Sequence, residues 1–399
     1  MPPGSPLRIA LFALGRQLQP LAGGELRIHH LAREMALRGH AVDLFSFVLR
    51  NHPAGEARPT PNLRIRQQHL LPLDLATLLA RARIIPLVSL PLWLRGLRRR
   101  IAHWTAATPY DIVQFEFPWF VEVYGAVRGS GRILYSAHNI ESHYWAARGA
   151  ARPSGRWLRR LERWETRAAG RAAGVIACTE EDRAWLAERG GLEPRRTIVI
   201  PNGYDARGIQ PPTGEERLAA RRVLGLAPEE KLILFIGHDT APNREAAAFL
   251  LDMMQARPSG APWRLGLVGR VGQAVAPAGR HDVLVPGQVT DVRPWLHAAD
   301  VSVNPMQSGS GSNLKVVEAL AAGLPVVSTR FGLRGYDDLR PFVELAELDS
   351  FGAAIGRALT RPRTAPVEVL RRYSWEALAE RQLAFYEEIT KLSPDGEGR

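Results

Sequence analysis

Short apolar runs that alternate with helical patterns constrain this chain more than any other feature of its sequence. In the first half, strand-like runs occupy residues 8–14, 41–47, 63–67, 111–116, 132–138, 174–179 and 197–202. Between the first two runs, Ile28, Leu31 and Met35 recur at helical spacing, and Gly39 stands where a helix would end. Buried strands separated by helices are typical of a parallel sheet with helices on both faces. The N-terminal half therefore predicts a doubly wound α/β domain.

The same alternation stops near residue 203 and then starts again. Residues 203–214 contain three glycines and the adjacent Pro211 and Pro212, which is typical of a linker. Further strand-like runs follow at 231–237, 264–269, 283–289, 301–305 and 325–329. The length of 399 residues fits two domains, and we predict one at 1–205 and a second at 206–372. Ligands of such sheets bind beyond the carboxyl ends of the strands, so we expect the site in the cleft between the domains.

The excess of basic residues is confined to the first half of the chain. Residues 1–205 hold 29 Lys and Arg against 17 Asp and Glu, whereas the rest of the chain holds 23 of each. This imbalance suggests that the first half meets an anionic partner, which would be phospholipid, nucleic acid or a phosphorylated substrate.

What the sequence lacks disfavours several classes of protein. Cys178 is the only cysteine, so an intrachain disulfide and a Cys-based zinc site are excluded. No apolar run reaches the roughly 18 residues of a membrane span, and we expect no export signal. The Asp-x-Asp, H-E-x-x-H, G-x-S-x-G and P-loop patterns are also missing, which disfavours a metal site of the Asp-x-Asp type, the matching hydrolases and P-loop kinases.

The strongest local signal is a loop of small residues between a strand and a helix. The run Ser308-Gly309-Ser310-Gly311-Ser312 precedes a helical pattern that begins near Asn313. Glycines let backbone N–H groups approach a ligand, and a helix N-terminus attracts phosphate. Lys315 adds a cation, and Glu318 can accept hydrogen bonds from ribose hydroxyls. On this loop alone, a tight turn capped by Ser312 or Asn313, with Glu318 in solvent, is an equally good interpretation.

Three weaker signals lie at other predicted strand ends. They are Gly23-Gly24, His138-Asn139-Ile140-Glu141, and Gly237-His238 followed by Asn243-Arg244. Taken singly, each fits a structural turn or a structural histidine. Functional residues concentrate in loops at strand ends, so the cluster at His138 favours function more than a lone histidine would.

Taken in order, these residues resemble the retaining, nucleotide-sugar-dependent glycosyltransferases of family 4, which have the two-domain GT-B fold. The resemblance also rests on Thr179-Glu180-Glu181-Asp182, Pro201-Asn202-Gly203, Pro242-Asn243 and Gly323-Leu324-Pro325-Val326-Val327. It implies two Rossmann-like, doubly wound α/β domains that face each other across a cleft, with a last helix at 375–390 packed back on the N-terminal domain. The implied function is retaining transfer of a hexosyl group from a nucleotide-diphosphate sugar to a glycan or lipid-linked acceptor, in surface polysaccharide or glycolipid assembly.

The resemblance also implies a role for each candidate residue. His138 and Gly24 would be catalytic, and Asn139 and Glu141 would lie on the acceptor side. The nucleotide sugar would be bound by Gly23, Gly24, Gly237, His238, Asn243, Arg244, Ser308, Gly309, Ser310, Gly311, Ser312, Asn313, Lys315 and Glu318. No cofactor and no metal are expected, because helix N-termini, glycine N–H groups and a cation can neutralise the departing diphosphate.

Two departures from the family pattern affect the donor site. Family members commonly carry two glutamates spaced E-x7-E, but here the first position is Ser310 and the second is Glu318. They also often carry an Arg and a Lys after the strand that ends at Gly237, where this chain has His238, Asn243 and Arg244. We expect Lys315 to be the substitute cation. Ser310 leaves open the alternative of a catalytically silent homologue that binds nucleotide sugars.

The first half also contains a segment typical of a membrane interface. Residues 70–104 combine many Leu and Ile with six arginines and two tryptophans. We expect a cytoplasmic protein with peripheral contact to an anionic membrane surface, at the inner face of the cytoplasmic membrane. The alternative is a helical pair packed on the N-terminal core. We expect no nucleic-acid partner, since no binding signature accompanies the charge, and a dinucleotide enzyme or epimerase has only an incomplete glycine fingerprint in its favour.

Overall fold

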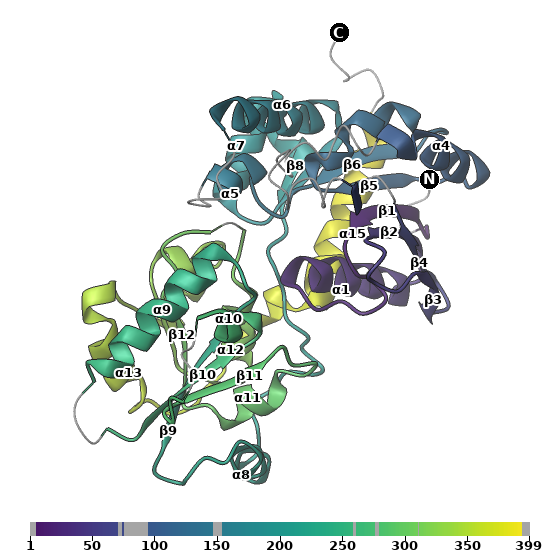
Figure 1. Ribbon diagram of the computed structural model, residues 1–399. Coiled ribbons are helices and arrows are strands. Elements are labelled where there is room, and N and C mark those ends of the chain that lie inside the picture. The colour runs from purple at the N-terminus through teal and green to yellow at the C-terminus, as the bar shows by residue number, and fades with distance from the viewer. Residues whose placement is uncertain are drawn as a thin grey trace. The chain divides into compact units, whose positions relative to one another are not determined.

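The computed structural model describes residues 5–70, 74–75, 95–146, 154–257, 261–275, 279–309 and 311–392. The chain divides into two compact units, one of Met1–Pro201 with Glu376–Arg399 and one of Asn202–Trp375. Each unit is built on one sheet flanked by helices (Figure 1). The prediction of two mostly parallel α/β sheets is therefore confirmed.

The first unit has an eight-stranded sheet, within the described residues, in the order β3-β4-β2-β1-β5-β6-β7-β8. Neighbouring strands run parallel, except that β3 and β4 are antiparallel. The strands are β1 (Arg8–Leu14), β2 (Ala41–Val48), β3 (Gly55–Thr60), β4 (Leu63–His69), β5 (Ile112–Glu116), β6 (Arg132–Ser136), β7 (Gly174–Ala177) and β8 (Thr197–Val199). The helices are α1 (Gly23–Leu37), α4 (Arg98–Ala107), α5 (Glu141–Ala146), α6 (Gly155–Arg171), α7 (Glu180–Gly190) and α15 (Trp375–Lys391), with 3₁₀ turns η2 (Arg95–Leu97), η3 (Pro118–Ala126) and η5 (Pro194–Arg196).

Stacked aromatic rings fill one face of this sheet. The Phe12 ring centroid lies 4.9 Å from that of Phe45 and 5.1 Å from that of Phe115, on three neighbouring strands. Trp104 of α4 stacks on Phe45 at 4.6 Å. Burial of rings this large drives the helix onto the sheet and leaves the strand ends as the place for polar groups.

The second unit repeats the plan with six described strands in the order β11-β10-β9-β12-β13-β14, all parallel. They are β9 (Lys231–Ile236), β10 (Trp263–Val268), β11 (Val283–Gly287), β12 (Val301–Asn304), β13 (Val326–Ser328) and β14 (Val343–Leu345). The helices are α8 (Gly214–Val223), α9 (Ala241–Gln255), α10 (Arg270–Val275), α11 (Arg293–Ala298), α12 (Leu314–Ala321), α13 (Phe351–Ala358) and α14 (Val367–Leu370). Further 3₁₀ turns are η6 (Phe331–Leu333), η7 (Asp337–Phe342), η8 (Leu348–Ser350) and η9 (Arg371–Tyr373).

Three details differ from the sequence patterns. The strands β3 and β14 were not predicted, because β3 has no apolar run and contains Pro59, whereas β14 is only three residues long. The strand β6 ends at Ser136, two residues earlier than predicted, so His138 lies in the loop after it. Of the segment 70–104, residues 71–73 and 76–94 lie outside the described residues. Within the described ranges, no helix combines the length and apolar character needed to cross a membrane.

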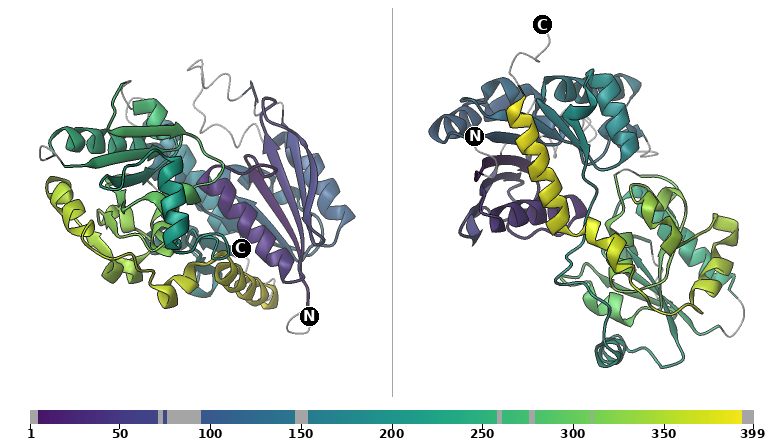
Figure 2. Two further views of the ribbon diagram at one scale, coloured as in Figure 1. Left: turned by 90° about the horizontal axis from the view of Figure 1, so that it is seen from below. Right: turned by 180° about the vertical axis from the view of Figure 1, so that it is seen from behind.

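The last helix packs on the sheet of the first unit, as the right-hand view of Figure 2 shows. Gly174 of β7 leaves the space that Phe385 and Ile389 of α15 fill. A Cβ atom at this glycine would lie 2.9 Å from the Phe385 Cζ atom and 2.9 Å from the Ile389 Cδ1 atom. The absence of a side chain at position 174 therefore sets how closely α15 approaches the sheet.

We predict that Gly174→Ala lowers the free energy of unfolding by about 1–3 kcal/mol, because the new methyl group overpacks the contact with α15. Urea unfolding measures the change. The matched control is Gly125→Ala, where a Cβ atom meets no other atom within 4 Å. Equal stabilities of the two variants would contradict this account of the packing of α15.

Candidate functional site

The candidate residues gather at two sheet edges, one in each unit. In the first unit, β1, β5 and β6 are neighbours, so their carboxyl ends lie together. Gly24 belongs to the first turn of α1, the helix that follows β1, and His138 follows β6. A Cβ atom on Gly24 would lie 3.1 Å from the His138 Nδ1 atom. The structure thus brings these two predicted residues into direct contact.

Glu116, the last residue of β5, completes this cluster. One of its carboxylate oxygens lies 2.8 Å from the His138 Nε2 atom, and the two side chains are only 3% and 8% exposed. Burial tends to raise the pKa of Glu116, but hydrogen bonds from His138, Ser136 and Gln114 outweigh it, and this pKa lies below the ordinary value. Burial lowers the pKa of His138 despite the opposing effect of Glu116. The pair therefore combines an ionised carboxylate with a neutral imidazole at neutral pH.

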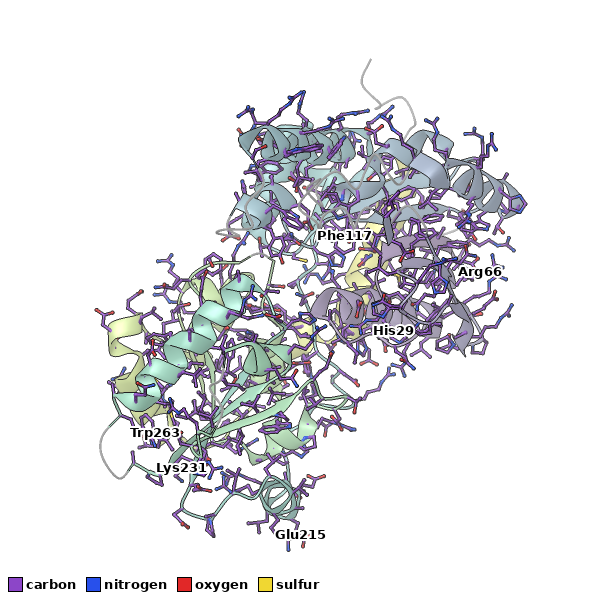
Figure 3. All side chains as sticks on the ribbon, in the orientation of Figure 1. His29, Arg66, Phe117, Glu215, Lys231 and Trp263 are labelled. Carbon is purple, nitrogen blue, oxygen red and sulfur yellow. The ribbon has the colours of Figure 1, made fainter. Side chains whose placement is uncertain are left out.

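The next residue, Phe117, has a strained backbone. Its φ of 80° and ψ of 151° fall in a region that is essentially restricted to glycine, and it is the only non-glycine residue with positive φ in the described part of the chain. Its ring centroid lies 4.4 Å from that of His138. Phe117 is labelled in Figure 3 within the first unit. The strain places an aromatic ring against the imidazole.

The two residues predicted on the acceptor side lie just beyond this cluster. Asn139 is half-buried in the loop between β6 and α5. Glu141 is the buried first residue of α5, where its carboxylate accepts a hydrogen bond from Trp145 Nε1 at 3.1 Å. Its backbone N–H donates to Glu165 at 2.6 Å. The Glu141 carboxylate therefore helps to hold α5 in place.

In the second unit, the predicted residues gather where β9 and β12 end. Lys315, in the first turn of α12, donates a hydrogen bond to Asn243 Oδ1 at 3.1 Å, and its Nζ atom lies 4.1 Å from the centroid of the Phe235 ring. The Asn243 amide donates in turn to the backbone oxygen of His238 at 2.9 Å. Gly237 packs against Asn243, since a Cβ atom there would lie 3.1 Å from the Asn243 Cγ atom. The structure therefore joins four of the predicted donor residues in one cluster.

The two charged groups of α12 have strongly shifted pKa values. Burial lowers the pKa of Lys315 to about 7 and raises the pKa of Glu318 to about 8. Both side chains keep some exposure, so a ligand can reach them. Each is close to its titration point at neutral pH, which is typical of residues in functional sites.

Other residues of the predicted donor loop bond within the protein. Ser312 accepts the Asn202 backbone N–H at 2.9 Å through its hydroxyl, and the Asn313 amide donates to the Gly332 oxygen at 2.9 Å. Ser308 donates to Glu245 at 3.3 Å. Further candidates are Arg244, paired with Asp239 at 3.3 Å, Gly23 in the first turn of α1, and Gly309 and Gly311, which both have positive φ. Ser310 lies outside the described residues.

Sequence reasoning missed Glu116 and Phe117. A single acidic residue at the end of a mostly apolar strand was the available signal for Glu116, whereas no sequence pattern indicated the φ of Phe117. Among the described residues, no three His, Cys, Asp or Glu side chains gather as the ligands of a metal ion would.

The strain at Phe117 leads to a prediction about stability. Phe117→Ala and Phe117→Gly both remove the ring, but only glycine relieves a strain that costs about 1–3 kcal/mol. We expect the glycine variant to be more stable than the alanine variant by about 1–2 kcal/mol, the reverse of the usual order, in urea unfolding. The same pair of variants at Phe342, a phenylalanine without positive φ, is the control. An alanine variant at 117 as stable as the glycine variant would show that the backbone there is unstrained.

Comparisons with known proteins place both halves of the chain in one class. Residues 21–207 match the model of the family described as Glycosyltransferase Family 4, and residues 230–361 match that described as Glycosyl transferases group 1. The chain is 29% identical to the D-inositol 3-phosphate glycosyltransferase of Geodermatophilus obscurus, over 92% of this chain and 86% of that protein.

Solved structures agree on the fold. The sucrose-phosphate synthase of Thermosynechococcus elongatus superposes with a TM-score of 0.75 at 20% identity, over 97% of this chain and 100% of that one. The Anabaena protein HepE in complex with UDP and glucose superposes with a TM-score of 0.65 at 16% identity, over 96% of this chain and 99% of that one. Each half of the chain matches a glycosyltransferase model and the two sheets agree with the GT-B fold, so the chain is a glycosyltransferase whose first half matches family 4.

Proposed function

We propose that this protein transfers a hexosyl group, with retention of configuration and without a metal ion, from a nucleotide-diphosphate sugar to a glycan or lipid-linked acceptor. The observation that carries the proposal is the contact between Lys315 and Asn243 at the start of α12, next to the loop that contains Gly309 and Gly311. A cation, a helix N-terminus and flexible backbone N–H groups together suit a diphosphate. Glu318, one turn further along α12, suits the ribose hydroxyls.

The proposed chemistry needs stabilisation of charge more than a nucleophilic side chain. The bond between the sugar C1 atom and the diphosphate breaks, and its electron pair goes to the diphosphate. The acceptor oxygen forms the new bond to C1, and its proton passes to an oxygen of the leaving phosphate. Attack from the face of the leaving group retains the configuration. Lys315 and the α12 N-terminus would stabilise the leaving group, and His138 would position the sugar.

The names of similar proteins suggest the substrates to test. The Geodermatophilus relative is named for D-inositol 3-phosphate, and HepE was solved with UDP. An anionic acceptor also fits the basic first half of the chain. A role in surface polysaccharide or glycolipid assembly, at the inner face of the cytoplasmic membrane, completes this proposal. The segment expected to contact that membrane, 70–104, lies largely outside the described residues.

The alternative function is a catalytically silent protein that binds nucleotide sugars. It is favoured by Ser310, which stands where the family commonly has a glutamate facing the donor sugar. Nucleotide binding without any sugar transfer would support this alternative. Transfer to an acceptor, or release of the nucleotide from its sugar, would exclude it.

The first prediction about the proposed function concerns the nucleotide. In a thermal-shift panel of UDP, GDP, ADP and CMP with their sugar conjugates, we expect one nucleotide to stabilise the protein, by about 2.7 kcal/mol at a hundredfold excess over its Kd. Glu318→Ala should remove most of this shift, because the ribose loses its acceptor. Glu368→Ala, an exposed glutamate of the same unit, is the control and should keep the shift. Absence of a shift with every nucleotide would contradict the donor site.

The second prediction about the proposed function concerns the charge of Lys315. Lys315→Met keeps an unbranched side chain that is one atom shorter and removes the cation, so we expect nucleotide diphosphate binding to weaken by about 1.5–3 kcal/mol at pH 6.5. In the free protein the pKa of Lys315 is about 7, and a bound diphosphate favours its protonated form. Above pH 7 the wild type must therefore take up a proton on binding, and its advantage over the variant should shrink up to about tenfold per pH unit.

Calorimetry of both proteins at several pH values measures this ratio of Kd values. Because the ligand and Glu318 titrate in both proteins, their effects cancel in the ratio. A ratio that stays constant between pH 6.5 and 9 would show that Lys315 does not contact the diphosphate as a titrating cation.

A further inference from the structure

A row of buried polar side chains connects the last helix to His138. The Tyr386 hydroxyl and the Gln382 amide of α15 both donate to the Gln114 side-chain oxygen, at 2.5 and 3.1 Å. The Gln114 amide nitrogen donates to Glu116, whose other oxygen lies 2.8 Å from His138 Nε2. The other four residues of this row, Glu116, Gln114, Gln382 and Tyr386, are no more than 3% exposed. The proposed transfer reaction assigns no role to any of these four.

The carboxylate fixes the direction of every hydrogen bond in this row. An ionised carboxylate only accepts hydrogen bonds, so Gln114 must turn its amide nitrogen toward Glu116 and its oxygen toward α15. That oxygen then requires donors, which the Tyr386 hydroxyl and the Gln382 amide supply. At the other end, the same carboxylate requires a proton on the Nε2 atom of His138. The acidic residue thus selects one tautomer of the imidazole.

The selected tautomer leaves the Nδ1 atom of His138 as a hydrogen-bond acceptor. This atom has no hydrogen-bond partner among the described residues, and it faces Gly24, where a Cβ atom would come within 3.1 Å. The charged groups that act on His138 are Glu116 on β5 and Arg27 on α1. Burial, and to a smaller extent the positive charge of Arg27, lower the pKa of the ring and oppose a second proton, so His138 stays neutral with its lone pair at Nδ1.

One further contact holds the imidazole ring in place. The Phe117 ring lies against the imidazole at 4.4 Å between centroids, and the strained backbone that puts it there directly follows Glu116. The imidazole is therefore fixed at its edge by a carboxylate and on one side by an aromatic ring. Such a set of contacts is typical of a histidine whose orientation matters for function.

We propose that Glu116 is the positioning residue of His138: it selects the Nε2–H tautomer and the ring orientation, and the last helix aligns Glu116 through Gln114. This inference rests on the proposed function, in which His138 contacts the donor sugar. It adds a residue that touches neither substrate, and it gives the last helix a part in the reaction.

The first test measures the tautomer directly and needs no substrate. Nitrogen-15 NMR of the wild type with labelled histidines, assigned by comparison with His138→Ala, should show a neutral Nε2–H ring at pH 7. In Glu116→Gln, the Gln114 amide still requires an acceptor, so the new amide turns its nitrogen toward His138. We expect the ring proton to move to Nδ1. A wild-type ring that is protonated on Nδ1 or on both nitrogens would overturn the inference, even if the variant failed to fold.

The second test measures turnover. The probes are UDP-glucose, GDP-mannose and ADP-glucose, and the readout is release of the nucleotide diphosphate. We expect Glu116→Gln to lower kcat about 10–100-fold and to change KM for the nucleotide sugar less than about threefold. The matched control is Glu122→Gln, which removes a carboxylate paired with Arg95 and Arg167 in the same unit and should leave kcat unchanged.

The His138→Ala variant separates the two levels of the argument. Loss of turnover in His138→Ala with normal turnover and an unchanged tautomer in Glu116→Gln would overturn the positioning role alone. Normal turnover in His138→Ala would overturn the role of His138 in the proposed function, and the positioning role with it.

Discussion

A parallel strand that is covered by helices on both faces presents a polar side chain to a ligand where the strand ends, because a polar group inside the close-packed core must be paired there, as Gln114 is. Both sheets of this protein obey that constraint. In the first sheet β1, β5 and β6 are neighbours, and in the second β9 and β12 are neighbours. The order of the strands alone therefore brings together the polar side chains at and beyond their carboxyl ends. His138 meets Glu116 at one edge, and Lys315 meets Asn243 at the other.

The same constraint decides how much could be predicted from the sequence. Strand ends can be read from where apolar runs stop, so His138 and the loop before α12 were found together with the α/β fold. Glu116 was missed because it occupies the last position of a mostly apolar strand, where a carboxylate is expected as the first residue of the following loop. The φ of Phe117 depends on a tertiary contact, because its backbone N–H donates to the oxygen of Ser136, 19 positions later in the chain. The hydrogen bond from Asn202 to Ser312 connects residues that are 110 positions apart. No local pattern encodes contacts of that kind.

The two clusters differ in how far hydrogen bonds offset the effect of burial on the pKa of a charged side chain. Glu116 receives hydrogen bonds from His138, Ser136 and Gln114, and these outweigh the effect of burial and keep the carboxylate ionised. Lys315 has one amide oxygen and the face of Phe235 as partners, which is too little to offset burial, so its pKa falls to about 7. A fully satisfied charge is suited to a fixed role such as orienting a neighbour. A buried cation with few partners, such as Lys315, is stabilised most when an anionic ligand binds beside it, and this property suits a binding residue.

The strain at Phe117 and the packing of α15 have a common explanation in this arrangement. A glycine at 117 would remove a strain of about 1–3 kcal/mol, but it would also remove the ring beside His138. Pro118 already confines the preceding residue to extended ψ values, so three consecutive residues supply the carboxylate, the ring and the turn. If α15 lacked the Tyr386 hydroxyl and the Gln382 amide, the Gln114 oxygen would be buried and unpaired, at a cost of about 1–3 kcal/mol. The last helix, 268 positions along the chain from β5, is therefore required both for the stability of the first unit and for the alignment of its histidine.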